Sequence, residues 1–81
     1  MAEIKFTKVN RSRYEITADG KYLCRVTGRD TAVRTQALFR DFESERECYG
    51  VREALWKYTS MNEVYFNTEI YAGLYKLARI K

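Results

Sequence analysis

The first third of the chain alternates between apolar and polar residues, the pattern of strands buried on one face. Residues 4–7 alternate in this way, and a turn follows at residues 10–12. The ranges 13–18 and 21–27 flank Asp19-Gly20. An Asp-Gly pair between two such ranges is a strong hairpin signal, because both residues tolerate the positive φ of a tight turn. We therefore predict an antiparallel sheet over residues 4–27.

The register of the hairpin depends on the length of its loop. A two-residue turn pairs Ile16 with Leu23 and leaves both faces mixed in polarity. A three-residue loop, with Gly20 as a left-handed bulge, pairs Ile16 with Tyr22. One face then carries Tyr14, Ile16, Tyr22, Cys24 and Val26, and the other carries Arg13, Glu15, Thr17, Lys21, Leu23 and Arg25. Because burial of one face fixes the register, we predict the three-residue loop, which places Arg13 opposite Arg25.

Residues 33–42 fit either a strand or a helix. As a strand, they direct Val33, Thr35, Ala37 and Phe39 inward, and Arg34, Gln36, Leu38 and Arg40 outward. We predict the strand, because Ser44-Glu45-Arg46-Glu47 is a capping box that gives the following helix its own start.

That helix is predicted over residues 45–59. Its core stripe consists of Cys48, Val51, Ala54, Leu55 and Tyr58. Gly50 lies inside it at a cost of about 1 kcal/mol relative to alanine, a position that suits the close approach of another element. Tyr49 and Trp56 share a separate flank, where they either pack beneath the C-terminal segment or form an exposed binding hot spot.

Residues 64–81 are predicted as a hairpin around Ala72-Gly73, with a helix as the alternative, because β-favouring residues dominate the first arm. The fold class is therefore α+β in a single domain over residues 1–81. About four antiparallel strands pack on one main helix, followed by a C-terminal hairpin or second helix.

Composition places the chain among small globular proteins, with 46% hydrophobic residues over 81 positions. Neither a transmembrane run nor a signal peptide begins the chain, so a cytoplasmic location is expected and no membrane partner. Cys24 and Cys48 are then expected to be reduced, buried apolar residues. Monomer and homodimer are both compatible with this size.

The chemistry of the chain favours binding over catalysis. There is no histidine, no phosphate-binding glycine loop and no nucleophile motif. Two cysteines cannot build a zinc site, and the acidic series in residues 41–47 suits a helix start better than a cation site. We therefore expect no enzyme activity, no cofactor and no metal.

Positive charge is concentrated in the first half, where residues 1–40 carry nine Lys or Arg and four Asp or Glu. Residues 41–81 carry six and seven. A basic half is typical of a phosphate-binding partner surface, although a solvated surface fits equally well. The candidate surfaces are an outer sheet face with Arg13, Lys21, Arg25, Arg34, Gln36 and Arg40, and the flank with Tyr49 and Trp56.

Two family resemblances follow from these motifs. Ile4-Lys5-Phe6, the Asp19-Gly20 turn, Arg25-Val26 and above all Arg40-Asp41-Phe42-Glu43-Ser44 resemble small phage anti-CRISPR proteins that inhibit the type I-F surveillance complex. The resemblance covers roughly the first 55 residues; the spacing before Arg40 and the C-terminus depart from it. It implies an antiparallel sheet with flanking helical structure, and binding to the crRNA-carrying backbone that blocks hybridisation with target DNA.

The second resemblance is to AP2-type and integrase arm-type DNA-binding domains. Asp19-Gly20-Lys21 and the range 42–48 are similar to the turn and the strand-to-helix junction of those domains. The stretch between Val26 and Arg40 and the C-terminal segment depart from them. This resemblance implies a three-stranded sheet whose arginines enter a DNA groove. The leading expectation is an anti-CRISPR-like inhibitor that binds a host defence nucleoprotein complex in the host cytoplasm, and the alternative is a direct DNA- or RNA-binding module.

Overall fold

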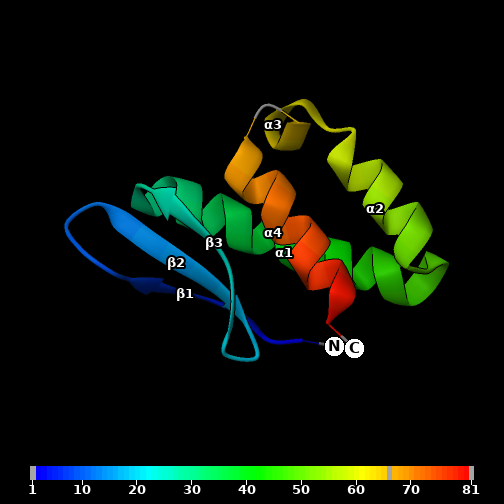
Figure 1. Cartoon of the computed structure of the whole chain (residues 1–81), viewed down its shortest axis with the longest axis horizontal. Helices are drawn as coiled ribbons and strands as arrows, with labels where there is room; N and C mark the ends of the chain where they lie inside the picture. The colour runs from blue at the N-terminus through cyan, green and yellow to red at the C-terminus, as the bar shows by residue number, and fades with distance from the viewer. Residues whose placement is uncertain (1, 66, 81) are drawn as a thin grey trace.

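The computed structural model describes residues 2–65 and 67–80 and confirms the α+β class. Within these residues the strands are β1 (Ile4–Lys8), β2 (Arg13–Ala18) and β3 (Lys21–Thr27), and the helices are α1 (Arg29–Tyr49), α2 (Val51–Thr59), the one-turn α3 (Asn62–Tyr65) and α4 (Thr68–Arg79), as Figure 1 shows. The described residues thus form three strands, whereas about four were predicted.

The sheet is antiparallel in the order β1-β2-β3, and its β2–β3 turn differs from the prediction. Ala18 pairs with Lys21, so the loop has two residues, and both adopt positive φ, 51° at Asp19 and 82° at Gly20. A β-bulge then shifts the register, so that Ile16 pairs with Cys24 rather than with Tyr22. The bulge adds one residue to β3, so that one face of the hairpin is again apolar and buried. Without the bulge, a two-residue turn would leave both faces with a mixture of apolar and polar residues.

The bulge also changes which residues of β3 are buried. Leu23 and Cys24 are both fully buried, although Leu23 was predicted to face outward. Tyr22, predicted to face inward, is 43% exposed. The predicted opposition of two arginines is wrong as well, because Arg13 pairs with Thr27 and Arg25 pairs with Glu15.

Residues 33–42 lie inside α1, so the predicted strand is wrong. The residues that the helix buries are Ala32, Thr35, Phe39, Phe42 and Glu43, and they recur with helical spacing. Val33 and Ala37, which the strand would have directed inward, are exposed. Ser44 therefore lies inside α1, and the capping-box pattern at residues 44–47 does not mark the start of a helix.

Gly50 ends α1 and separates it from α2, where a single helix was predicted. Its φ of 92° lies in the region that favours glycine, and a Cβ there would have no neighbour within 4 Å. Gly50 therefore serves backbone conformation rather than close packing. Ala54 and Tyr58 are buried as predicted, whereas Cys48 and Val51 are exposed and Leu55 is half-buried.

The C-terminal segment forms the helix α4, so the preferred hairpin is wrong and the alternative is right. The Asn67 side chain caps α4 by accepting hydrogen bonds from the backbone N–H groups of Glu69 (3.1 Å) and Ile70 (3.2 Å). Gly73, read from the sequence as a turn residue, lies instead where α4 packs closely on β3 and α1.

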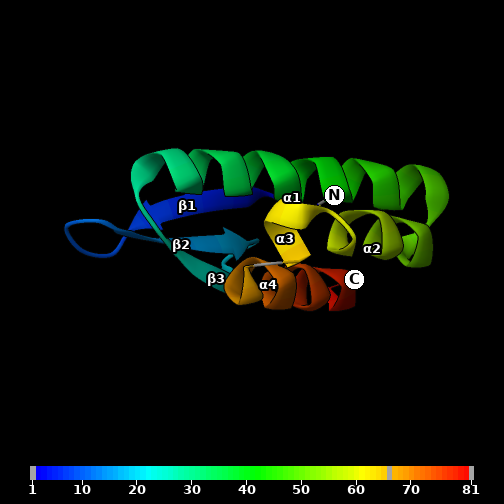
Figure 2. The ribbon, with the colours of Figure 1, turned by 90° about the horizontal axis from the view of Figure 1, so that it is seen from above.

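Figure 2 shows α1 running along the strands, with α4 beside β3. The core lies between the inner sheet face and these two helices. The side chains of Glu43 and Arg46 form hydrogen bonds with residues near both ends of the chain and so connect those residues to α1. Glu43 Oε2 accepts a hydrogen bond from the Ala2 backbone N–H (3.1 Å), and Arg46 donates to the α4 carbonyl of Leu77 (3.0 Å) and to that of Ile80.

Candidate functional site

The sheet face turned away from the core is exposed to solvent and polar. Strand pairing places its residues in three rows across the sheet: Lys5, Thr17 and Tyr22, then Thr7, Glu15 and Arg25, then Arg13 and Thr27. Each of these side chains is exposed or half-buried. We call this set the outer sheet face.

The charges on the outer sheet face are only weakly neutralised. Arg25 Nη2 lies 3.3 Å from Glu15 Oε2. Lys5 Nζ lies 3.2 Å from Glu3 Oε1. Exposed ion pairs of this kind contribute little to stability, so an incoming phosphate can replace either carboxylate. Arg13 forms no ion pair with another described residue.

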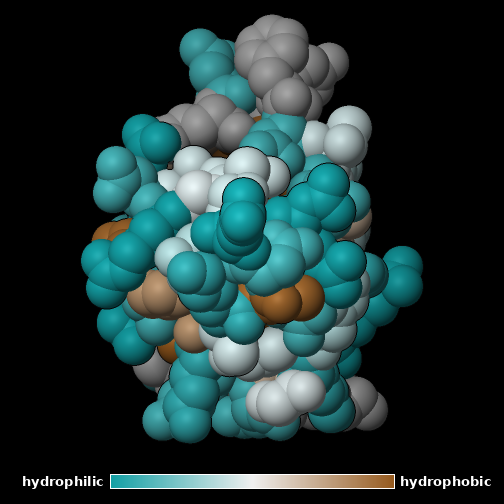
Figure 3. All heavy atoms as spheres, turned by 90° about the vertical axis from the view of Figure 1, so that its left-hand side faces the viewer, coloured by the Kyte–Doolittle hydropathy of each residue, from teal (hydrophilic) through white to brown (hydrophobic). Residues whose placement is uncertain are grey.

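The β1–β2 hairpin extends this basic surface away from the helices, on the left of Figure 1. Lys8 and Arg11 are exposed there, and the end of the molecule that the hairpin forms is mostly hydrophilic in Figure 3. The loop is ordered by the Asn10 side chain, whose Oδ1 accepts a hydrogen bond from the Arg13 N–H (3.3 Å). Sequence reasoning missed Lys5, Lys8 and Arg11. Their signal was a run from residue 4 to 14 with four cations and no acid.

The predicted basic surface is divided between two elements of the structure. Arg13 and Arg25 lie on the outer sheet face, and Lys21 lies at the exposed end of the β2–β3 hairpin. The other three predicted residues, Arg34, Gln36 and Arg40, lie on α1 instead, because the strand predicted for them is a helix.

Each of these α1 residues has a different environment. Gln36 donates from Nε2 to the carbonyl of Ile4 (2.8 Å) and so ties α1 to β1. Arg34 lines a groove, and Arg40 is exposed outside it. Of the predicted set, Arg13 and Arg25 therefore share the outer sheet face.

Tyr49 and Trp56 are both exposed, by 68% and 72%. They lie on different helices, because Gly50 separates α1 from α2, and no ring contact between them occurs among the described residues. The alternative in which they pack beneath the C-terminal segment is therefore wrong.

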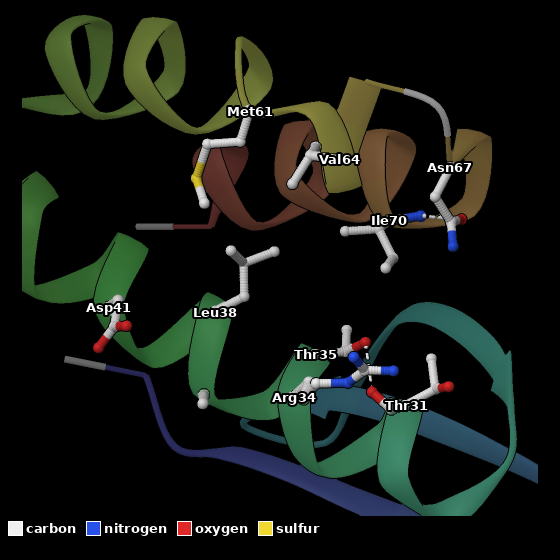
Figure 4. A pocket seen from close by; sticks show the side chains of 10 residues that line it. Thr31, Arg34, Thr35, Leu38, Asp41, Met61, Val64, Asn67 and Ile70 are labelled. Carbon is white, nitrogen blue, oxygen red and sulfur yellow. Dashed lines mark hydrogen bonds between the residues drawn. The ribbon is translucent and has the colours of Figure 1, made fainter.

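A groove of about 570 Å³ lies between α1 on one side and α3 with the start of α4 on the other (Figure 4). We call it the α1–α3 groove. Leu38, Met61, Val64 and Ile70 contribute apolar side chains to it. Arg34 and Asp41 lie toward its opposite ends, with Leu38 between them.

Burial shifts the pKa values of two residues of β3, Cys24 and Tyr22. Burial raises the pKa of the Cys24 thiol to about 12, which suppresses the thiolate needed for nucleophilic attack. Burial first, and Glu69 second, raise the pKa of Tyr22, whose ring lies 4.6 Å from Lys76 Nζ. Among the described residues, no three His, Cys, Asp or Glu side chains are grouped to hold a metal ion. No helix within the described ranges is both long and apolar enough to traverse a bilayer.

The chain matches no protein-family model, and no match to it was found among curated protein sequences or solved structures. The resemblances to anti-CRISPR proteins and to AP2-type domains therefore stay expectations, supported by the motifs that suggested them.

Proposed function

We propose that this protein is a non-enzymatic nucleic-acid-binding module that contacts phosphates through the outer sheet face and the β1–β2 hairpin. The distribution of charge carries this proposal. Residues 1–29, which contain all three strands, have seven Lys or Arg and three Asp or Glu, a net charge of +4. Residues 30–81 have eight of each. The net charge of the protein thus belongs entirely to its strand-containing part.

The geometry suits a duplex groove. A DNA major groove about 12 Å wide admits a β-ribbon, and the projecting hairpin presents Lys8, Arg11 and Arg13 at its edge. Threonine hydroxyls on the same face can donate to phosphate oxygens alongside the cations. The outer sheet face carries no Asn or Gln, so we expect binding to depend mainly on phosphates and little on base sequence.

Salt dependence tests this proposal. Affinity for a duplex of about 20 base pairs should fall linearly with salt on logarithmic axes, with a slope near −0.9 per phosphate contact. Arg11→Ala and Arg13→Ala should each reduce that slope by about 1. Arg52→Ala removes an exposed charge from α2 and is the matched control, with an unchanged slope expected. Equal effects of all three variants would show general electrostatic attraction and refute a phosphate-binding face.

A second candidate is a phage-type, anti-CRISPR-like inhibitor that binds a host defence nucleoprotein complex in the cytoplasm. The exposure of Trp56 and Tyr49 favours it, because large exposed aromatic rings are typical centres of protein interfaces. Co-purification with the defence complex should then survive high salt and be lost in Trp56→Ala. Recovery of no complex, together with undiminished phage restriction, would exclude this candidate.

A further inference from the structure

The α1–α3 groove lies apart from the outer sheet face and has its own chemistry. Its floor is apolar, with Val64 fully buried and Ile70 only 7% exposed. Leu38 and Met61 are half-buried and complete an apolar surface that stays accessible from outside. A volume of about 570 Å³ is within the range of sites that bind a ligand or a few side chains.

Opposite charges lie toward the two ends of this apolar floor. Arg34, Leu38 and Asp41 are separated by four and three residues along α1, which places them on one face of the helix. Neither Arg34 nor Asp41 forms an ion pair with another described residue. Seven residues of α-helix span about 10 Å, so the cation and the anion are too far apart to neutralise each other.

The end of the groove near Arg34 offers further hydrogen-bond donors. Asn67 uses its side-chain oxygen to cap α4, which leaves its amide Nδ2 as a donor beside the groove. The hydroxyl of Thr31 lines the same end (Figure 4). A carboxylate is therefore favoured at this end, and a cation is favoured near Asp41.

We propose that the α1–α3 groove binds a short extended segment of a partner polypeptide in which an acidic, an apolar and a basic residue stand at alternate positions. Successive side chains of an extended chain point to opposite sides, so the first, third and fifth residues face the groove together. Four steps of such a chain span about 13 Å. Arg34 points away from Asp41 in Figure 4, so their charged groups are farther apart than the roughly 10 Å between their backbone positions. The inference does not depend on nucleic-acid binding, because it concerns a different surface.

Three capped pentapeptides test the proposal: Glu-Ser-Leu-Ser-Lys, Glu-Ser-Leu-Ser-Glu and Lys-Ser-Leu-Ser-Lys. Each is titrated into ¹⁵N-labelled full-length protein, and amide shifts are followed by two-dimensional NMR. The mixed peptide should bind in the millimolar range, about two- to fivefold more tightly than either uniformly charged peptide. The shifts should centre on Leu38, Val64 and Ile70.

Charge-reversal variants make the test specific. Arg34→Glu leaves acids at both ends and should prefer Lys-Ser-Leu-Ser-Lys, whereas Asp41→Lys should prefer Glu-Ser-Leu-Ser-Glu. Both positions are exposed, so the fold should tolerate either change. Arg40→Glu is exposed on α1 outside the groove and makes the same charge change as Arg34→Glu. It should keep the wild-type preference.

Three outcomes would overturn the proposal. One is equal binding of all peptides, another is a set of shifts outside the groove, and the third is no binding at tens of millimolar peptide. Octanoate serves as a competitor of different class. If it binds the groove more tightly than the mixed peptide and needs only Arg34, the site takes small amphipathic acids and not a peptide. Duplex binding is measured separately, so either proposal can fail alone.

Discussion

Gly73→Ala tests the close packing of α4 against β3 and α1. A Cβ built on Gly73 would lie 2.9 Å from Phe39 Cζ, 3.3 Å from Cys24 Cβ and 3.4 Å from the carbonyl oxygen of Leu23. These three atoms belong to α1 and to β3, so the glycine sets the distance at which α4 packs on both. Phe39 and Cys24 are fully buried, and neither side chain can move into solvent to make room.

Two effects of opposite sign decide the outcome. Alanine stabilises a helix interior by about 1 kcal/mol relative to glycine. Overpacking a dense core costs roughly 1–3 kcal/mol. The second term is larger because the contact with Phe39 is below van der Waals separation, so we expect a net loss of about 1 kcal/mol in the free energy of unfolding. For a domain of this size, that corresponds to a fall of about 4–8 °C in Tm.

Thermal unfolding followed by circular dichroism measures this change. Ala72→Gly is the control, because it lies at the exposed neighbouring position and should cost about 1 kcal/mol through helix propensity alone. In a Phe39→Leu background the clashing ring atom is absent, so Gly73→Ala should become neutral or stabilising. A higher Tm for Gly73→Ala in the wild-type background would refute the close approach of α4.

Further predictions concern the core, the cysteines and the junction of the chain ends. Leu74→Ala should cost about 2–5 kcal/mol in urea unfolding. Trp56→Ala should change stability by less than about 0.5 kcal/mol, and a larger loss would place the indole in the core. At about pH 8, Cys48 should react quickly with a thiol reagent and Cys24 slowly; two fast thiols would contradict the burial of Cys24. Because burial raises the pKa of Cys24 from 9.0 to about 12, the stability due to its protonated form is complete below pH 9 and is lost as pH rises toward 12, which urea unfolding across that range would detect. Arg46→Ala should cost about 2–3 kcal/mol in the same assay, because it removes donors to two carbonyls and the cation beside the buried Glu43 carboxylate, which still accepts from Ala2; an unchanged midpoint would show that these bonds contribute nothing.

Local signals located the three strands along the chain, although they did not give the register of the β2–β3 hairpin. Alternation in residues 4–7 and the turn chemistry of Asp19-Gly20 predicted β1 and the β2–β3 hairpin, and the ranges 13–18 and 21–27 are those of the strands. They also placed Arg13 and Arg25 on the exposed side of the sheet. Such signals locate a hairpin because turn-forming residues and a period of two are properties of neighbouring residues. They did not fix the loop length, since a three-residue loop was predicted and the loop has two residues.

Tertiary packing decided the rest. Residues 33–42 carry both an alternating and a helical pattern, and burial of Phe39 and Phe42 on one stripe is favourable only where the sheet offers them an inner face. The β-bulge allows Leu23 and Cys24 to be buried together. No local sequence pattern signals this additional burial of apolar area. The α1–α3 groove likewise depends on side chains from α1, α3 and α4, which become neighbours only when those helices pack. Contacts between distant segments, and not local propensity, therefore selected the helices, the register and the candidate peptide site.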